Sequence, residues 1–325
     1  MIERFFGSGK SLTEYCEALD DGYKLAEIFL SQQNKTTVNQ QWKEHSAIIT
    51  LFILDAIQLL RKHEKVVVLG AGNCSDINIS ILATHFEKIF LVDIDTEAAN
   101  GAVEKVPEEF RKKIDVINED LTGLYSSRVM KDLIDSIQRK NIKRINRSLN
   151  NIKSEVKHLP RPLSHLNSTC DLVISSCVSS QFFMPLFIAM CDGLNRKIFN
   201  EIYPTAVTVA NSLASRYLEL MYNIIGPAGY LVFIADIFEW SNYDGKLSPF
   251  AEVFRNHSII NSDIIKDTIL NRPDLRIAGG FPKNTADYFN PVINGYIVNS
   301  RQWWWEFSPQ KRYLVQGHLL EPKKS

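Results

Sequence analysis

The chain has 325 residues, of which 45% are hydrophobic and 23% charged, and these fractions exclude a disordered or collagen-like protein. Lysine plus arginine and aspartate plus glutamate both number 37, so the formal net charge is zero. Without a global basic excess, nucleic acid is not an expected partner. The N-terminus lacks the apolar stretch of a secretory signal, and no apolar run is long enough to span a bilayer. We therefore expect a cytoplasmic protein without a membrane partner.

The five cysteines are odd in number and form no C-x-x-C pair. This pattern predicts neither a disulfide framework nor a metal site. Free, buried thiols in a reducing compartment are the expected outcome.

Apolar residues recur at helical spacing in residues 11–32 and 45–62, which predicts two helices before the first strand. We expect an N-terminal helical cap, residues 1–63, followed by an α/β domain, residues 64–325. Short apolar and β-branched runs predict strands at 65–69, 89–92, 114–117, 171–175 and 230–234. Helical segments near 76–86, 96–105 and 205–224 separate them, and residues 226–229 are expected to form a turn. Such alternation indicates a doubly wound, mostly parallel sheet.

Two further segments complete the expected architecture. Apolar residues three and four apart predict a helical insertion at about 126–165. Within 128–161, ten Lys or Arg residues stand against three acidic ones. This segment is either a solvated helix face or a basic surface for an anionic acceptor. Strands near 295–298 and 313–318 predict an antiparallel edge, which brings the sheet to seven strands.

The turn after the first predicted strand is rich in glycine and reads Gly70-Ala71-Gly72-Asn73-Cys74-Ser75-Asp76. A dinucleotide needs G-x-G-x-x-G, because backbone and a helix N-terminus must meet its pyrophosphate. Here Ser75 stands at the sixth position, and Asp76 stands where the anion would have to come. A carboxylate suits a cofactor that carries a cationic sulfonium and an ammonium group.

From about residue 45 to residue 235 the sequence resembles the class I S-adenosylmethionine-dependent methyltransferases. The segments similar to that family's motifs are 66–74, 91–95, 118–121, 170–176 and 226–231. The resemblance implies a Rossmann-like fold, S-adenosyl-L-methionine as cofactor, and methyl transfer to a small-molecule acceptor. Two positions depart from the family's pattern, because Val68 replaces a frequent acid and Cys74 replaces a third glycine. Asp76 is the candidate for the missing carboxylate.

The resemblance also implies a cofactor site. Asp93 would accept hydrogen bonds from the ribose hydroxyls, Ile94 would pack on the adenine, and Asp120 would accept from the adenine amino group. Asp95 is instead expected to cap the next helix. The predicted cofactor-binding residues are Gly70, Ala71, Gly72, Asn73, Asp76, Asp93, Ile94, Asp120, Leu121 and Ser175.

We expect the acceptor beyond the carboxyl ends of strands 171–175 and 230–234. Trp42, Trp240 and Tyr243 are predicted to line its pocket, and His45 is predicted to act as a base if the nucleophile arrives protonated. Two alternatives remain open. One is a non-catalytic protein that binds a nucleoside or the cofactor, and the other is an aminopropyl or aminocarboxypropyl transferase with the same cofactor.

Overall fold

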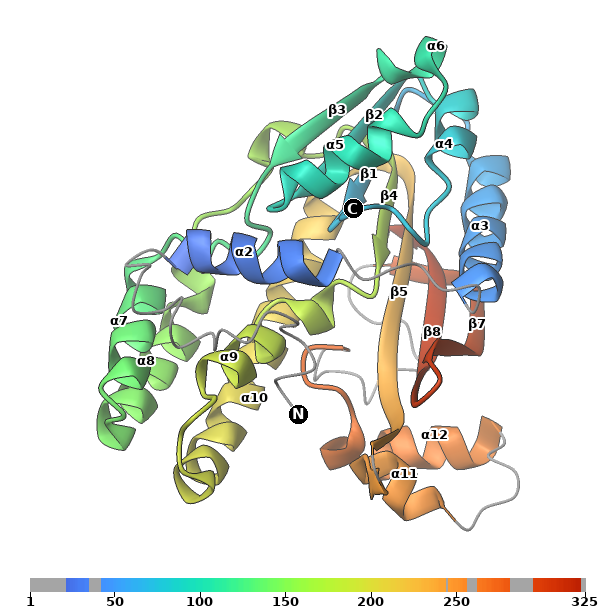
Figure 1. Ribbon diagram of the computed structural model, residues 1–325. Helices are drawn as coiled ribbons and strands as arrows, with labels where there is room; N and C mark the ends of the chain where they lie inside the picture. The colour runs from blue at the N-terminus through green and yellow to red at the C-terminus, as the bar shows by residue number, and fades with distance from the viewer. Residues whose placement is uncertain (1–21, 35–41, 244, 256–261, 281–294, 323–325) are drawn as a thin grey trace.

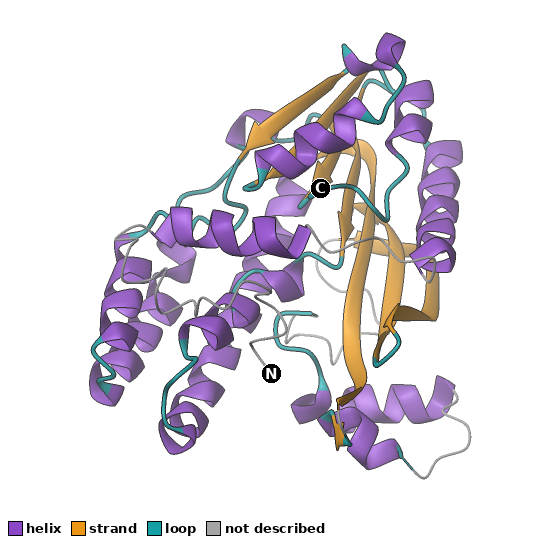
Figure 2. Ribbon diagram, in the orientation of Figure 1, coloured by secondary structure: helices purple, strands orange, loops and turns teal. Residues whose placement is uncertain are grey.

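The computed structural model describes residues 22–34, 42–243, 245–255, 262–280 and 295–322. Helices cover both faces of a central sheet (Figures 1 and 2). The strand order is β3-β2-β1-β4-β5-β8-β7, and β6 pairs with β5 off this path. The strands are β1 (Lys65–Leu69), β2 (Lys88–Asp93), β3 (Ile114–Asn118), β4 (Cys170–Ser176), β5 (Ile225–Tyr243), β6 (Lys246–Leu247), β7 (Gly295–Ser308) and β8 (Lys311–Pro322).

Strands β1 to β5 are parallel, and β8 runs antiparallel between β5 and β7. The predicted doubly wound, mostly parallel sheet with an antiparallel edge is thereby confirmed. Seven strands form its path, as predicted, and β6 adds an eighth. The prediction of a turn at 226–229 is wrong, because these residues are extended and belong to β5. A Cβ at Gly229 would meet the carbonyl oxygens of Cys170 and Asp171 at 2.8 Å. Gly229 therefore allows β5 to approach β4 closely, because only a residue without a Cβ fits there.

The described helices are α2 (Gly22–Asn34), α3 (Trp42–Leu59), α4 (Ile79–His85), α5 (Thr96–Glu104), α6 (Glu108–Arg111), α7 (Arg128–Gln138), α8 (Ile142–Glu155), α9 (Met184–Met190), α10 (Arg196–Ile224), α11 (Pro249–Phe254) and α12 (Ser262–Asn271). Helix α3 packs on one face of the sheet, where its Phe52 shares a core with Val68 and Ile174. Helix α10 packs on the other face, where Met221 joins Val173. Alternation along each buried strand supplies apolar side chains to both faces.

The two N-terminal helices separate instead of forming one cap. Helix α3 is a layer of the sandwich, whereas α2 packs against α5 and α7. In Figure 1, α2 crosses the carboxyl ends of β2 and β3. The hydroxyl of Tyr23 donates to the side-chain oxygen of Asn118, the last residue of β3. Helix α2 therefore lies over the carboxyl ends of β2 and β3.

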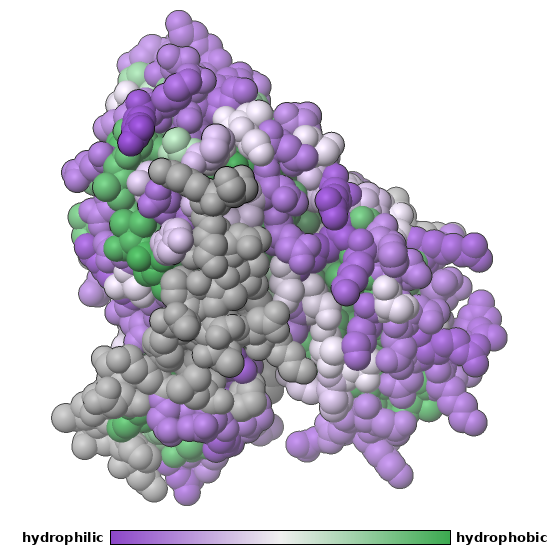
Figure 3. Space-filling model, turned by 180° about the vertical axis from the view of Figure 1, so that it is seen from behind, coloured by the Kyte–Doolittle hydropathy of each residue, from purple (hydrophilic) through white to green (hydrophobic). Residues whose placement is uncertain are grey.

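The predicted insertion is helical and consists of α7 and α8, which pack side by side. The two helices together form an arm whose apolar face is buried. Leu133, Ile145 and Leu149 lie on this face, in a core shared with α9 and α10. All ten basic residues of the segment are exposed, and in Figure 3 this arm is largely hydrophilic. The guanidinium of Arg216 on α10 donates to the backbone carbonyls that follow α8. The arm is thus anchored through its apolar face, and its charges face water.

We predict that Gly70→Ala lowers the free energy of unfolding. Gly70 follows β1 directly and has φ +68°, and a Cβ there would lie 2.5 Å from Val178. Left-handed backbone costs a non-glycine residue about 1 to 2 kcal/mol, and overpacking costs about 1 to 3 kcal/mol. The matched control is Gly101→Ala in α5, where nothing lies within 4 Å of the added Cβ. Urea unfolding should show a loss for the first variant and none for the second; equal stabilities would contradict the assigned turn.

Candidate functional site

The loops after β1 and β4 meet where the order of strand addition reverses. The chain adds β2 and β3 on one side of β1 and then places β4 on the other side. In such sheets the crevice at this reversal is where ligands bind. A close-packed contact between Gly70 and Val178 joins the two loops.

The loop after β1 has left-handed backbone at Gly70, Gly72 and Cys74, with φ of 68°, 47° and 49°. The amides of Gly70 and Ala71 donate to the carbonyl of Val92 at 2.8 and 3.1 Å. Cys74 thus occupies, with the conformation of glycine, the position where a third glycine was expected. The Asn73 side chain accepts from the Ser75 amide at 3.1 Å and shapes the same loop. The sequence had identified this loop, but not the left-handed cysteine.

Asp93 ties this loop to the end of β2. Its carboxylate accepts from the amide of Gly72 at 2.7 Å and from the amide of Asp95 at 2.8 Å. Burial raises the pKa of Asp93, while these backbone donors act in the opposite direction. Each carboxylate oxygen has two lone pairs, so both can still accept from a ligand hydroxyl. Asp95 accepts from the amide of Ala98 and caps α5, which confirms its predicted role.

Asp76 joins the loop after β1 to β4 and α3. Its carboxylate accepts from the hydroxyl of Ser176 at 2.5 Å and lies 4.0 Å from Nε2 of His45. Burial raises the pKa of Asp76, and the bond from Ser176 lowers it. The predicted residue Ser175 is fully buried on the opposite face, where it accepts from the Tyr217 hydroxyl at 2.9 Å. Strand alternation therefore presents Ser176, and not Ser175, to the loop after β1.

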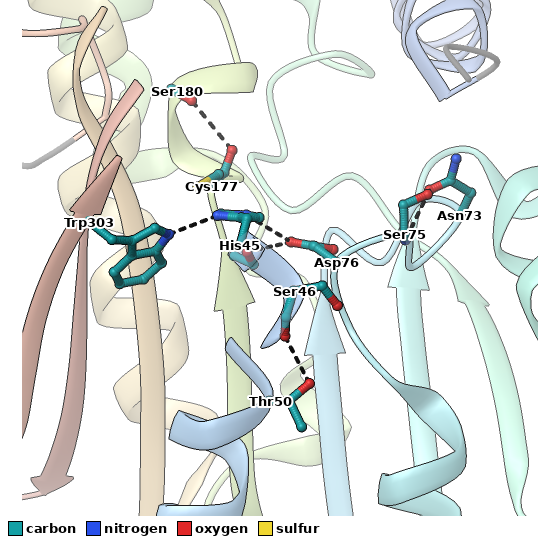
Figure 4. Close-up of polar contacts among 10 residues, drawn as sticks. His45, Ser46, Thr50, Asn73, Ser75, Asp76, Cys177, Ser180 and Trp303 are labelled. Carbon is teal, nitrogen blue, oxygen red and sulfur yellow. Dashed lines mark hydrogen bonds and ion pairs between the residues drawn. The ribbon is translucent and has the colours of Figure 1, made fainter. Parts of the chain in front are cut away.

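His45, in the first turn of α3, is only 1% exposed. Its Nδ1 accepts from the indole N–H of Trp303 at 3.0 Å, and its ring stacks on Trp305 with centroids 4.1 Å apart. An indole nitrogen only donates, so Nδ1 carries no proton and the neutral ring holds its proton on Nε2. Figure 4 shows Nε2 facing Asp76. Burial lowers the pKa of His45 to about 3. This geometry makes His45 a hydrogen-bond donor, whereas the predicted base needs a free lone pair on Nε2.

Asp120 turns its carboxylate toward its own loop. It accepts from the amide and hydroxyl of Thr122 at 2.9 and 2.6 Å and from the amide of Tyr125 at 2.7 Å. Ile94 is 4% exposed and packs in a core with α2. Leu121 is buried on the face covered by α10. The contacts of these three residues with adenine stay predictions, and α2 borders the place where the base would lie.

The predicted acceptor-pocket residues fall into two places. Trp42 donates to the carbonyl of Phe307 at 3.2 Å and contacts Trp305 edge to face. It also borders a surface hollow of about 540 Å³, lined further by Lys43, Ser46, Ala47, Thr50, Leu51 and Ser75. Trp240 packs instead with Phe250 and Trp304 in the extension of β5, and Tyr243 ends that strand. Helix α3 thus brings Trp42 and His45 to the loop after β1, while Trp240 and Tyr243 lie beside α11.

The structure adds three residues that we did not predict for the site. Trp303 fixes the tautomer of His45, Ser176 binds Asp76, and Asp236 is buried in β5 beyond the end of β4. Burial raises the pKa of Asp236 to about 6. Alternation from Ile174 to Ser176 was the available signal for Ser176. For the contact of Trp303 with His45 no sequence signal existed, because a strand near the C-terminus meets a helix near the N-terminus only in the folded chain.

No protein-family model matches the chain, and no curated protein matches it. The structure is similar to solved S-adenosylmethionine-dependent methyltransferases. The N-methyltransferase NodS from Bradyrhizobium japonicum, in complex with S-adenosyl-L-homocysteine, is 10% identical with a TM-score of 0.42, over 92% of this chain and 98% of NodS. A methyltransferase from Leishmania major is 11% identical with a TM-score of 0.41, over 92% and 82% of the two chains. One from Aquifex aeolicus is 13% identical with a TM-score of 0.35, over 83% and 87%. This similarity is one of fold.

The described cysteines are buried thiols outside any disulfide, as predicted, and Cys16 lies outside the described residues; they are Cys74, Cys170, Cys177 and Cys191. Burial raises the pKa of Cys170 to about 11, so this thiol stays protonated at neutral pH. Among the described helices, none has the length and apolar character needed to cross a membrane.

The buried His45 predicts a pH-dependent stability. Its pKa is about 3 in the folded chain and 6.5 as the ordinary value, so the unfolded chain binds more protons between these limits. Stability contributed by neutral His45 is therefore present above pH 6.5 and is lost as the pH falls toward 3. We predict that the stability difference between wild type and His45→Phe shrinks by about 1 to 3 kcal/mol from pH 7 to pH 4.5. Urea unfolding at both pH values measures it, and a constant difference would mean that His45 is not held neutral.

Proposed function

We propose that the protein transfers a methyl group from S-adenosyl-L-methionine to a small-molecule acceptor. The position of the Asp76 carboxylate carries this proposal. Asp76 lies in the loop after β1 at the reversal of strand order, where a dinucleotide would place its pyrophosphate. Carboxylates repel that anion and attract a sulfonium and an ammonium group. The same fold therefore favours the cationic cofactor over the dinucleotide.

The described residues fit this cofactor. Gly70, Ala71, Gly72 and Asn73 would let it lie along the backbone, because the glycines carry no Cβ. The free lone pairs of Asp93 would accept from the ribose hydroxyls. The nucleoside would extend toward Ile94, Asp120 and Leu121 beside α2. The methionine end would extend toward Asp76, whereas the predicted Ser175 faces the other side of the sheet. Bound there, the cofactor would supply a methyl group already activated by its positive sulfur.

The protein's own contribution is alignment and exclusion of water. Helix α2 packs beside the nucleoside end, and α3 packs beside the acceptor end through Trp42 and His45. The bond from Ser176 holds the Asp76 carboxylate in place, so it need not reorganise when a ligand binds. Holding two reactants in the reactive geometry can itself lower the barrier by about 7 to 11 kcal/mol.

The exposed basic arm formed by α7 and α8 supports an anionic acceptor. Its negative group would lie at a distance from the atom that receives the methyl group. Its ten cationic side chains surround the outer faces of α7 and α8. The free thiols support the predicted cytoplasmic location. Product mass separates methyl transfer from aminopropyl or aminocarboxypropyl transfer and from binding without turnover, because the three give different mass changes.

Asp93→Ala should weaken binding of S-adenosylhomocysteine at least tenfold. The variant loses two hydrogen bonds to a charged acceptor, worth about 1.5 to 3 kcal/mol each before compensation. Calorimetric titration measures the affinity, and circular dichroism shows whether the variant folds. Asp93→Asn is the variant of matched shape if the alanine variant unfolds.

Asp115→Ala on the neighbouring strand β3 is the matched control, since its exposed carboxylate pairs with Lys88 at 2.6 Å, away from the loop after β1. Unchanged affinity in a folded Asp93→Ala protein would contradict the assigned ribose site. Tighter binding of NAD than of S-adenosylhomocysteine by the wild type would contradict the proposed function as a whole.

A further inference from the structure

Three buried polar atoms near the carboxyl edge of the sheet have no hydrogen-bond partner among the described residues. They are Nε2 of His45, Nε1 of Trp305 and Oδ1 of Asp236. Their residues are 1%, 8% and 3% exposed. A buried polar atom left unpaired costs about 1 to 3 kcal/mol, and folded proteins pair nearly all of them. Three together indicate that this place receives a polar ligand.

The three atoms lie on the face of the sheet that α3 covers. Ser176 pairs in parallel register with Ile234, and Asp236 follows Ile234 by two residues, so its side chain points to the same face as that of Ser176. Trp305 belongs to the core that α3 forms with β7. Asp236 is held from the other side by a hydrogen bond with Ser180. The second oxygen of Asp236 is the one left unpaired.

Contacts link part of a group of residues on this face that we call the ring: His45, Asp76, Cys177, Asp236, Trp305 and Tyr313. Nε2 of His45 lies 4.0 Å from Asp76, and the His45 ring stacks on Trp305. The centroid of Trp305 lies 5.6 Å from that of Tyr313.

Cys177 closes the ring on its other side. Burial raises the pKa of Cys177, and the charges of Asp236 and Asp76 raise it further. Burial and the charges of Glu239 and Asp236 likewise raise the pKa of Tyr313. Figure 4 shows Cys177 between Ser180 and His45. The Asp76 side chain is 21% exposed, and the ring opens to the surface there.

The composition of the ring suits a cation. It places carboxylates at its open and closed ends, and carboxylates attract an ammonium group. A buried carboxylate needs a positive or donating partner. Lys311, the cation whose charge reaches Asp236, is itself bonded to Glu239 at 3.1 Å. The unpaired oxygen of Asp236 is therefore available to a ligand.

We propose that this ring binds the amine nitrogen of the acceptor and that Asp236 is the catalytic residue that takes its proton. The inference rests on the proposed function and names its substrate class. A protonated amine would give one proton to the Asp236 carboxylate and so free its lone pair. The lone pair forms the new N–C bond to the methyl carbon while the C–S bond breaks and its electron pair goes to sulfur. The products are S-adenosylhomocysteine and a methylated ammonium ion.

Other groups of the ring have defined parts in this step. Asp76, at the open end, attracts the incoming ammonium group. His45 and Trp305 each present an N–H group. Such donors bind an oxygen of the substrate or a water beside the amine, and they do not bind a second cation, which has no lone pair to offer. A pKa of about 6 at Asp236 matches a base that works near neutral pH.

The experiment is a calorimetric titration of the wild-type protein saturated with S-adenosylhomocysteine. The probes are primary n-alkyl amines of increasing length and the n-alkyl alcohols of equal length. At least one amine should bind tenfold more tightly than its alcohol. Asp236→Asn should abolish this preference and keep the affinity for S-adenosylhomocysteine within twofold, whereas Asp115→Asn should change neither. With S-adenosylmethionine, the preferred amine should gain one methyl group by mass spectrometry, at a rate at least a hundredfold lower in Asp236→Asn.

Alcohols that bind as tightly as amines across the series would overturn the inference, as would a folded Asp236→Asn protein that keeps the preference. The comparison of amine with alcohol in the wild type decides the matter even where Asp236→Asn fails to fold. If S-adenosylhomocysteine does not bind to the wild type, the proposed function itself fails. If it binds without a preference for amines, only the ring assignment fails.

Discussion

The hydrogen bond from Ser176 to Asp76 is the interaction on which the candidate site depends. It joins the loop after β1 to the end of β4, across the reversal of strand order, and so fixes the crevice that this topology opens. The bond matters because Asp76 is a carboxylate whose pKa burial raises. The hydroxyl of Ser176 stabilises the ionised carboxylate by donating a hydrogen bond to it. The same bond keeps the carboxylate pointing toward α3. The chemistry of the crevice, attractive to cations, follows from this one constraint.

Helix α3 and strand β7 complete the site from opposite ends of the chain. Trp303 lies 258 residues after His45 and donates to its Nδ1, which leaves the other ring nitrogen as a donor aimed at Asp76. Stacking on Trp305 holds the imidazole ring parallel to the indole ring. The aromatic residues therefore do more than fill the core. The hydrogen bond from Trp303 decides the tautomer of a buried histidine, and the tautomer decides that Nε2 is a donor and not an acceptor.

Helix α2 and the α7–α8 arm surround the other half of the crevice. Phe29 of α2 shares its core with Ile94 and Leu133, so the nucleoside end of the proposed site is built partly from chain that precedes the sheet. The arm contributes apolar contacts inward and positive charge outward. A chain with zero formal net charge thus has an acidic crevice and a basic arm.

The sequence by itself determined the sheet, because buried parallel strands such as 65–69 are short apolar runs whose alternation with helices allows few topologies. It also located the loop of Gly70 and Gly72 and the acid Asp93, since these follow directly from strand ends. Ser176 and Asp236 lie on one face of the sheet, and Ser175 lies on the other. The tertiary structure alone decided that the face with Ser176 and Asp236 is the one that α3 covers. It also turned His45 from a predicted base into a donor. Both outcomes depend on which strand face meets which distant element, and local residue patterns do not contain that information.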